Sequence, residues 1–109
     1  MSSLSTHVLD TMHGVPAKGL EIRLFSGKIM LLEGKLDSSG RLRVEAPLPS
    51  GKYRIEFDVG AYFSGLGVAL PDPPFLDVVP IDFGMADVEG HYHVPLLVTP
   101  WSYGTYRGS

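Results

Sequence analysis

The segment KYRIEFDV, residues 52–59, alternates strictly between apolar and charged side chains. The apolar members share one side of an extended chain and are Tyr53, Ile55, Phe57 and Val59. Successive side chains of a strand point to opposite faces, so a period of two is typical of a strand that has one buried face and one solvated face. This segment therefore predicts a β-strand in a sheet that covers a core.

Two earlier segments repeat the alternation. In residues 20–25 the apolar positions Leu20, Ile22 and Leu24 recur at every second residue, and in residues 41–46 the recurring positions are Leu42, Val44 and Ala46. The segment DSSG, residues 37–40, has the composition of a turn. We expect further strands at residues 6–10, 29–35, 78–83, 91–99 and 102–107, and one short helix at residues 60–68. About eight closely spaced strands favour an all-β fold, a β-sandwich.

Composition narrows the classes of function. A chain of 109 residues, 44% of them hydrophobic, suits one domain spanning residues 1–109. Its net charge of −3 offers no basic face for nucleic acid, and no apolar run reaches the roughly 18 residues of a membrane helix. Without cysteine there is neither a disulfide nor a thiolate metal site. No signal peptide is evident, so we expect a cytoplasmic protein without nucleic-acid or membrane partners.

The segment HYHVPLLV, residues 91–98, contains the clearest candidate site. If its alternate residues from Tyr92 to Val98 face the core, His91, His93, Pro95 and Leu97 share the outer face. Two imidazoles beside an apolar side chain suggest that a ligand or another subunit covers this face. Imidazole transfers protons near neutral pH, so the pair could act as a general base that adds water to a carbonyl.

Two other interpretations of these histidines stay open, and Ser109 is a further candidate site residue with an alternative of its own. Strand histidines often only form hydrogen bonds, without any catalytic role. The His-x-His pair could also bind a metal, with His7 or His13 as a third nitrogen donor. A serine near a chain end, such as Ser109, is often part of a frayed tail.

Separated motifs resemble the 5-hydroxyisourate hydrolases, also called transthyretin-related proteins. The match lies in LSTHVLD at residues 4–10 with HGVPA at residues 13–17, in SGR at residues 39–41, and in HYHVPLL at residues 91–97 with the closing YRGS. The resemblance implies a transthyretin-like sandwich of two four-stranded sheets with one short helix. It also implies a homotetramer, a dimer of dimers, with active sites in the channel between dimers.

The resemblance further implies an activity and a site. Members of this family hydrolyse 5-hydroxyisourate to 2-oxo-4-hydroxy-4-carboxy-5-ureidoimidazoline in urate catabolism, without metal or cofactor. Their catalytic set falls on His7, Arg41 and His93, and Ser109 joins these residues in binding the substrate. One histidine would activate water and the other would donate a proton, while the planar guanidinium of Arg41 would hold the substrate.

The sequence also leads to expectations for the other two histidines and to an alternative function. We expect His91 to support His93 or to lie in an interface, and His13 to be solvated in a turn. Transthyretin itself resembles the family in fold but lacks the His, Arg, His set. The alternative function is accordingly a carrier that binds a small aromatic ligand in the channel without turning it over.

Overall fold

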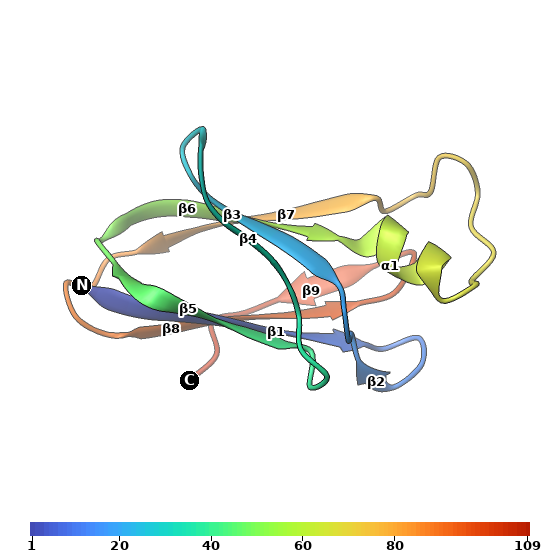
Figure 1. Cartoon of the computed structure of the whole chain (residues 1–109), viewed down its shortest axis with the longest axis horizontal. Coiled ribbons are helices and arrows are strands. Elements are labelled where there is room, and N and C mark those ends of the chain that lie inside the picture. The colour runs from blue at the N-terminus through green and yellow to red at the C-terminus, as the bar shows by residue number, and fades with distance from the viewer.

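The computed structural model describes residues 1–109 as two β-sheets packed face to face, with one short helix at one end (Figure 1). The elements in chain order are β1 (Ser2–Asp10), β2 (Val15–Pro16), β3 (Glu21–Ser26), β4 (Ile29–Lys35), β5 (Arg41–Leu48), β6 (Gly51–Asp58), α1 (Val59–Gly65), β7 (Val78–Met85), β8 (His91–Val98) and β9 (Tyr103–Thr105). The predicted all-β sandwich with one helix is therefore confirmed.

The two sheets differ in size. One has four strands in the order β4-β3-β6-β7, and the other has five, in the order β2-β1-β8-β9 with β5 also paired to β1. The expected number of four strands per sheet is thus wrong for the second sheet, because the two-residue strand β2 pairs with the end of β1. We call this five-stranded layer the β1–β8 sheet, after its central parallel pair.

Several element boundaries differ from the predicted ones. Strand β1 begins at Ser2 rather than at residue 6, and β9 covers only three of the six residues expected at 102–107. The helix is Val59–Gly65 rather than residues 60–68. Ala46 was expected to face the core but is exposed, because a bulge shifts the pairing of β1 with β5 beyond Leu4.

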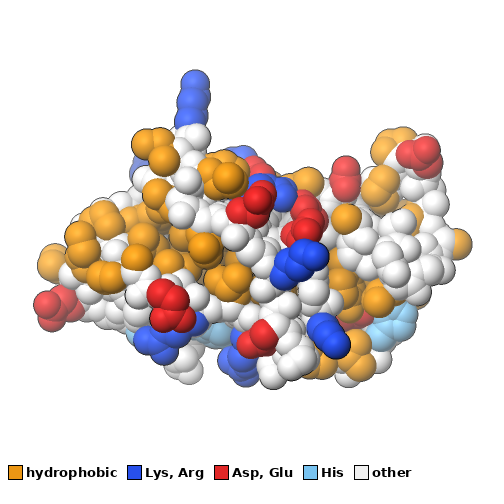
Figure 2. Space-filling model, in the orientation of Figure 1, with side chains coloured by type: hydrophobic (Ala, Val, Ile, Leu, Met, Phe, Trp, Pro, Cys, Tyr) orange, Lys and Arg blue, Asp and Glu red, His pale blue; other side chains and the backbone are white.

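The core follows the alternation of the strands. The apolar positions predicted in residues 20–25 and 52–59 are all buried, and 20 buried hydrophobic residues form one cluster between the sheets. No helix is long and apolar enough to cross a membrane. Figure 2 shows that apolar side chains also gather on the surface over β4 and β5, and the exposed ones in β4 are Ile29, Met30 and Leu31.

Candidate active site

The outer face of the β1–β8 sheet brings together three of the predicted site residues. In β1 the side chains alternate between buried even positions and partly exposed odd positions, so His7 points outward. In β5, Arg41 is the direct cross-strand neighbour of His7. In β8, His93 lies opposite Ser5 of β1, which places it diagonal to His7. Two imidazoles and one guanidinium therefore share a face across three adjacent strands.

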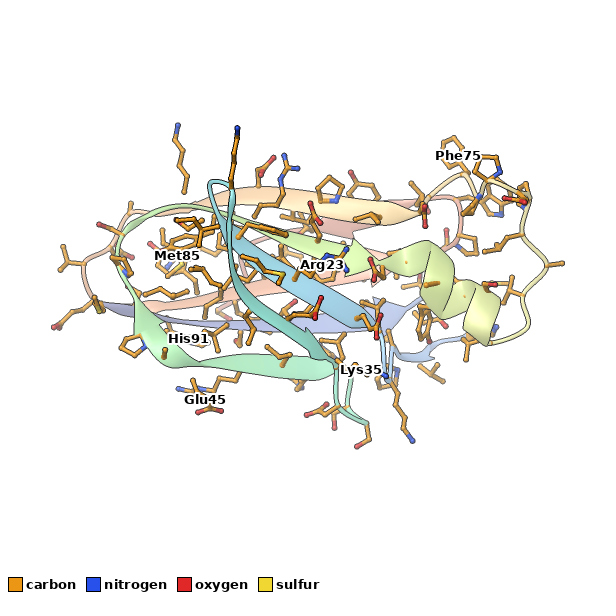
Figure 3. The ribbon with its side chains drawn as sticks, turned by 45° about the horizontal axis from the view of Figure 1, so that its top comes forward. Arg23, Lys35, Glu45, Phe75, Met85 and His91 are labelled. Atoms are coloured by element: carbon orange, nitrogen blue, oxygen red, sulfur yellow. The ribbon has the colours of Figure 1, made fainter.

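This face is the side of the sandwich away from β3 and β6. Figure 3 shows Arg23 of β3 over one sheet and Glu45 of β5 below the other. Glu45 and Arg43 are exposed at alternate positions of the same strand as Arg41. In Figure 1 the C-terminus lies beneath the β1–β8 sheet, on its outer side. The C-terminal residues thus approach the face that carries the histidines.

A tight turn delivers Arg41 to its place beside His7. Asp37 Oδ1 accepts hydrogen bonds from the backbone N–H groups of Ser39 and Arg41, at 2.9 and 3.0 Å. Gly40 has φ of +70°, and a Cβ there would lie 2.7 Å from the carbonyl oxygen of Val8. Only glycine allows this close approach of the turn to β1, which the Val8 N–H to Gly40 carbonyl bond of 2.9 Å then secures.

His93 lies in an environment that favours its neutral form. Its Nδ1 is 2.8 Å from Ser5 Oγ, and the side chain is partly buried. Burial lowers the pKa of His93 below the ordinary value of 6.5, and Arg41, His7 and His91 nearby lower it further. A neutral imidazole has one unprotonated ring nitrogen, so His93 is available as a proton acceptor at neutral pH.

The C-terminal segment packs directly on His93. After β9, the N–H of Gly108 donates a 2.8 Å hydrogen bond to the His93 carbonyl oxygen. Arg107 is the residue before Gly108. Its guanidinium carbon lies 4.1 Å from the centre of the Tyr92 ring, and this cation–π contact also holds the segment in place. Ser109 follows directly, and its side chain makes no hydrogen bond within the chain. The structure therefore brings Ser109 to the site region but gives it no fixed contact there.

We expect Gly108→Ala to lower kcat by roughly tenfold, because a Cβ at this position would lie 2.5 Å from Cδ2 of the His93 ring. The ring or the segment must move, and small displacements of a catalytic group are costly in rate. Steady-state kinetics measures the effect. Gly104→Ala is the matched control, since a Cβ there meets nothing within 4 Å. Equal rates in both variants would contradict the expectation.

His13 lies in the turn after β1 and is exposed, as predicted, but its ring also contacts a buried carboxylate that the sequence did not predict. Its Nδ1 is 2.6 Å from Oδ2 of the fully buried Asp10, and its side chain is 39% exposed. Asp10 points to the core side of β1, so His13 cannot join His93 as a third metal donor. No group of three His, Cys, Asp or Glu side chains is arranged to hold a metal ion.

Sequence reasoning missed the small residues that surround the histidines. Ser3 and Ser5 occupy the outward positions of β1 before His7, and both bond to histidine rings of β8. The signal was present as a period of two through Ser3, Ser5 and His7. A strand predicted to begin at residue 6 leaves Ser3 and Ser5 outside it, whereas β1 begins at Ser2.

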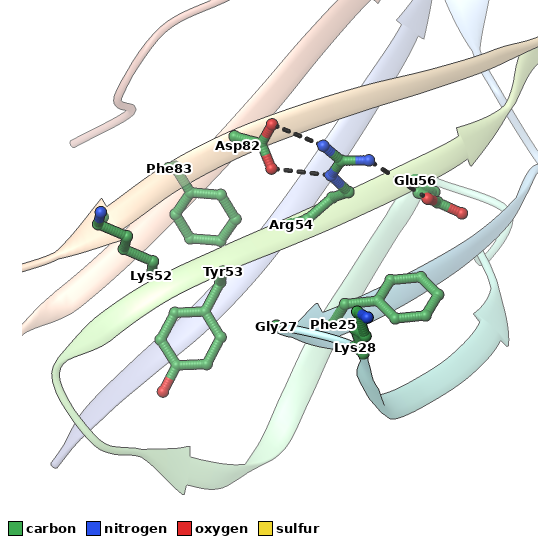
Figure 4. Close-up of a pocket in the computed structure, with 10 residues that line it drawn as sticks. Phe25, Gly27, Lys28, Lys52, Tyr53, Arg54, Glu56, Asp82 and Phe83 are labelled. Carbon is green, nitrogen blue, oxygen red and sulfur yellow. Dashed lines mark hydrogen bonds and ion pairs between the residues drawn. The ribbon is translucent and has the colours of Figure 1, made fainter.

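A hollow of about 820 Å³ lies on the opposite sheet, between the β3–β4 hairpin and β6 and β7 (Figure 4). Its lining includes Phe25, Lys52 and Arg54 but no histidine. Arg54 is bound by Asp82 through hydrogen bonds of 2.8 and 2.9 Å, and Glu56 lies 3.9 Å from its Nη1. The guanidinium in this hollow is thus neutralised by the chain itself, unlike Arg41.

Comparisons with known proteins agree with this architecture. The sequence model of the HIUase/Transthyretin family matches residues 4–108. A 5-hydroxyisourate hydrolase from Ralstonia nicotianae is 50% identical, with 100% of both chains covered. The structure of 5-hydroxyisourate hydrolase from Klebsiella pneumoniae matches with a TM-score of 0.89 and 35% identity, covering 100% of both chains. Sea bream transthyretin in complex with thyroxine matches with a TM-score of 0.81 and 30% identity, covering 96% of this chain and 93% of that one.

Proposed function

The chain belongs to the HIUase/Transthyretin family and, like its full-length relatives, is a 5-hydroxyisourate hydrolase; we propose that His7, Arg41 and His93 are its catalytic residues. The observation that carries this assignment is the joint position of the three side chains on one sheet face. Proton transfer and charge stabilisation, the two requirements of amide hydrolysis, are met by these residue types.

In the proposed reaction His93 is the general base. Its unprotonated ring nitrogen removes a proton from water while the water oxygen attacks C6 of the six-membered ring. The negative charge that develops on the C6 oxygen lies within reach of Arg41, whose guanidinium stays protonated. His7 donates a proton to N1 as the C6–N1 bond breaks, which yields a carboxylic acid and an N–H. The lowered pKa of His93 supports this division of roles.

Substrate binding uses the same four positions that the resemblance implies. The fork of N–H donors on Arg41 suits the carbonyl or enolate oxygens of a planar urate-like ring. Ser109 follows the Gly108 contact with His93, and its free hydroxyl is available to the substrate or to the attacking water. We assign no nucleophilic role to Ser109, because no base is bonded to it.

The cellular setting is also part of the proposal. We take residues 1–109 as one hydrolase domain that acts on a small molecule in urate breakdown, in the cytoplasm. The reaction as written needs no metal or cofactor, since His7, Arg41 and His93 supply every proton and charge. Activity that persists in a chelating buffer would support this mechanism, and activity that disappears there and returns with zinc would overturn it.

We further propose a homotetramer, a dimer of dimers. Strands β7 and β9 each have one unpaired edge, and the outer face carries the exposed Leu97. Pairing of such edges and covering of such a face are ways in which a small chain gains buried area. We expect light scattering after size-exclusion chromatography to give four times the chain mass of 11.8 kDa. A stable active monomer would contradict a site shared between subunits.

The function itself is tested by the ultraviolet decay of freshly generated 5-hydroxyisourate. The protein should accelerate the decay well above the spontaneous rate. If the folded protein leaves that rate unchanged, the hydrolase assignment is wrong and the transthyretin-type carrier takes its place. Binding of an aromatic ligand, measured by calorimetry, would then be the next readout.

A further inference from the structure

We propose that Ser5, His91 and Ser3 form a hydrogen-bonded chain behind His93 which determines the ring nitrogen that carries the His93 proton. The inference rests on the proposed role of His93 as general base. In this view Ser5 and His91 are positioning residues for the reaction: they do not touch the substrate, and they act through His93. The chain runs along the outer face from the site toward the start of β1.

The parallel pairing of β1 with β8 creates the chain. Ser5 lies opposite His93, and Ser3 lies opposite His91, all four at outward positions. Ser5 Oγ is 2.8 Å from His93 Nδ1 and 3.2 Å from His91 Nε2. Ser3 Oγ is 2.6 Å from His91 Nδ1 and 3.5 Å from the Gly90 carbonyl oxygen. The four side chains alternate serine, histidine, serine, histidine without a gap.

When both rings are neutral, two arrangements let the hydrogen bonds run in one direction along the hydrogen-bonded chain. A third, in which Ser5 accepts from both rings, requires Ser3 to donate to His91 instead of to the Gly90 carbonyl oxygen. A hydroxyl has one proton to donate, and a neutral imidazole has one N–H and one acceptor nitrogen. In the first arrangement His93 Nδ1–H donates to Ser5, Ser5 donates to His91 Nε2, and His91 Nδ1–H donates to Ser3. In the second arrangement every bond is reversed, so Ser5 donates to His93 Nδ1.

The two arrangements differ at the reacting nitrogen. The first leaves Nε2 of His93 unprotonated and able to accept a proton from water. The second places a proton on Nε2, so His93 can no longer act as the base. The far end of the chain favours the first arrangement, because there the Ser3 hydroxyl donates to the Gly90 carbonyl oxygen, which can only accept.

The chain also serves the step after proton transfer. Once His93 has taken a proton on Nε2, both of its ring nitrogens are donors, and Nδ1–H keeps its bond to Ser5. The same orientation therefore suits the ring before and after the transfer. A partner that fixes the tautomer of a catalytic histidine acts in this way.

A matched pair of substitutions isolates the Ser5 hydroxyl. Threonine and valine have nearly the same shape and both suit a strand, but only threonine keeps a hydroxyl. We expect Ser5→Thr to retain kcat within about threefold, and Ser5→Val to lose roughly tenfold or more in kcat with KM within about twofold. Equal losses in both variants would show that only the added methyl matters. Unchanged kcat in Ser5→Val would overturn the proposed role of the hydrogen-bonded chain.

Nitrogen-15 NMR of the histidine rings gives a readout independent of turnover. We expect the Nδ1–H tautomer of His93 to predominate in the wild-type protein and to lose population in Ser5→Val but not in Ser5→Thr. A wild-type His93 with its proton on Nε2 would overturn the proposal even in a fully active enzyme. If the wild-type protein does not hydrolyse 5-hydroxyisourate, the assigned function is wrong. The tautomer of His93 can still be measured in that case, so the two failures are distinguishable.

The length of the chain is tested at His91. Replacement by phenylalanine keeps a planar ring but removes both nitrogens, so Ser5 loses the acceptor to which it donates. We expect His91→Phe to lower kcat by several fold, less than Ser5→Val, and to shift the His93 tautomer in the same direction. If His91→Phe leaves both the tautomer and kcat unchanged, the chain beyond Ser5 has no role.

Discussion

His93→Ala is expected to lower kcat for 5-hydroxyisourate hydrolysis by about 10²- to 10⁴-fold, the usual contribution of a positioned general base. The methyl side chain cannot accept a proton, and Arg41 and His7 remain to polarise the carbonyl and protonate the leaving nitrogen. The ultraviolet assay of substrate decay measures the loss. Because His93 is only partly buried and its strand pairs through the backbone, the variant should still fold.

The chain contains a matched control for this experiment. Of its four histidines, His13 alone lies away from the outer face of the β1–β8 sheet. We expect His13→Ala to keep kcat near the wild-type value even though it costs stability. Equal losses of kcat in the two folded variants would contradict the assignment of His93 as the base.

The pH profile gives the same prediction a second readout. A general base works when unprotonated, so activity falls as the pH drops through its pKa. Burial, Arg41 and the neighbouring histidines lower the pKa of His93. The acid limb of kcat/KM should therefore lie below pH 6.5, the ordinary value for histidine. An acid limb above that value would indicate another base.

Much of the fold could be predicted because strand period is a local signal. Residues 29–35 and 52–58 alternate or run apolar over enough positions to be recognised without knowledge of their neighbours. The first residues of β1 lack the contrast between apolar and polar positions that marks such a period, because the inward positions Ser2 and Thr6 are polar although they are buried. Their Oγ atoms donate to carbonyl groups of Asp87 and Val94, at 3.0 and 2.6 Å. A buried polar side chain is interpretable only once its distant partner is known.

The candidate site was predictable in part for the same reason. Alternation alone placed His91 and His93 on an outward face of their strand. It could not place Arg41 beside His7, because that register depends on the turn through Gly40 and on antiparallel pairing across a long loop. The resemblance to a family supplied this set of residues. The bonds of Ser3 and Ser5 to the histidines needed the parallel register of β1 with β8.

A buried carboxylate ties the end of β1 to the helix, and its loss should have the largest effect on stability. Asp10 is fully buried and accepts hydrogen bonds from His13 Nδ1 at 2.6 Å, from the His13 backbone N–H at 3.0 Å and from the Tyr62 hydroxyl at 2.9 Å. Tyr62 belongs to α1, so one carboxylate joins three segments. Burial acts to raise the pKa of Asp10, but these hydrogen bonds outweigh it and leave the pKa below 3.8.

We expect Asp10→Ala to lower the free energy of unfolding by about 3 kcal/mol at pH 7, because it leaves two side-chain donors without an acceptor and opens a cavity. Asp10→Asn keeps the shape and one acceptor oxygen, so its loss should be smaller, about 1–2 kcal/mol. Urea unfolding measures both values. The protein concentration is held constant, because association of subunits makes the apparent stability depend on it. A loss below about 0.5 kcal/mol for Asp10→Ala would show that these bonds contribute little net stability.

The pH dependence of this difference follows from the direction of the pKa shift. A carboxylate whose pKa is lower in the folded state stabilises that state fully above its unfolded pKa, and the contribution disappears as the pH falls through the folded value. The gap between wild type and Asp10→Ala should therefore be constant from pH 7 down to about pH 5 and shrink below pH 3.8. A gap that widens on acidification would mean that Asp10 is protonated in the folded protein. In that case burial outweighs the hydrogen bonds in setting the pKa of Asp10.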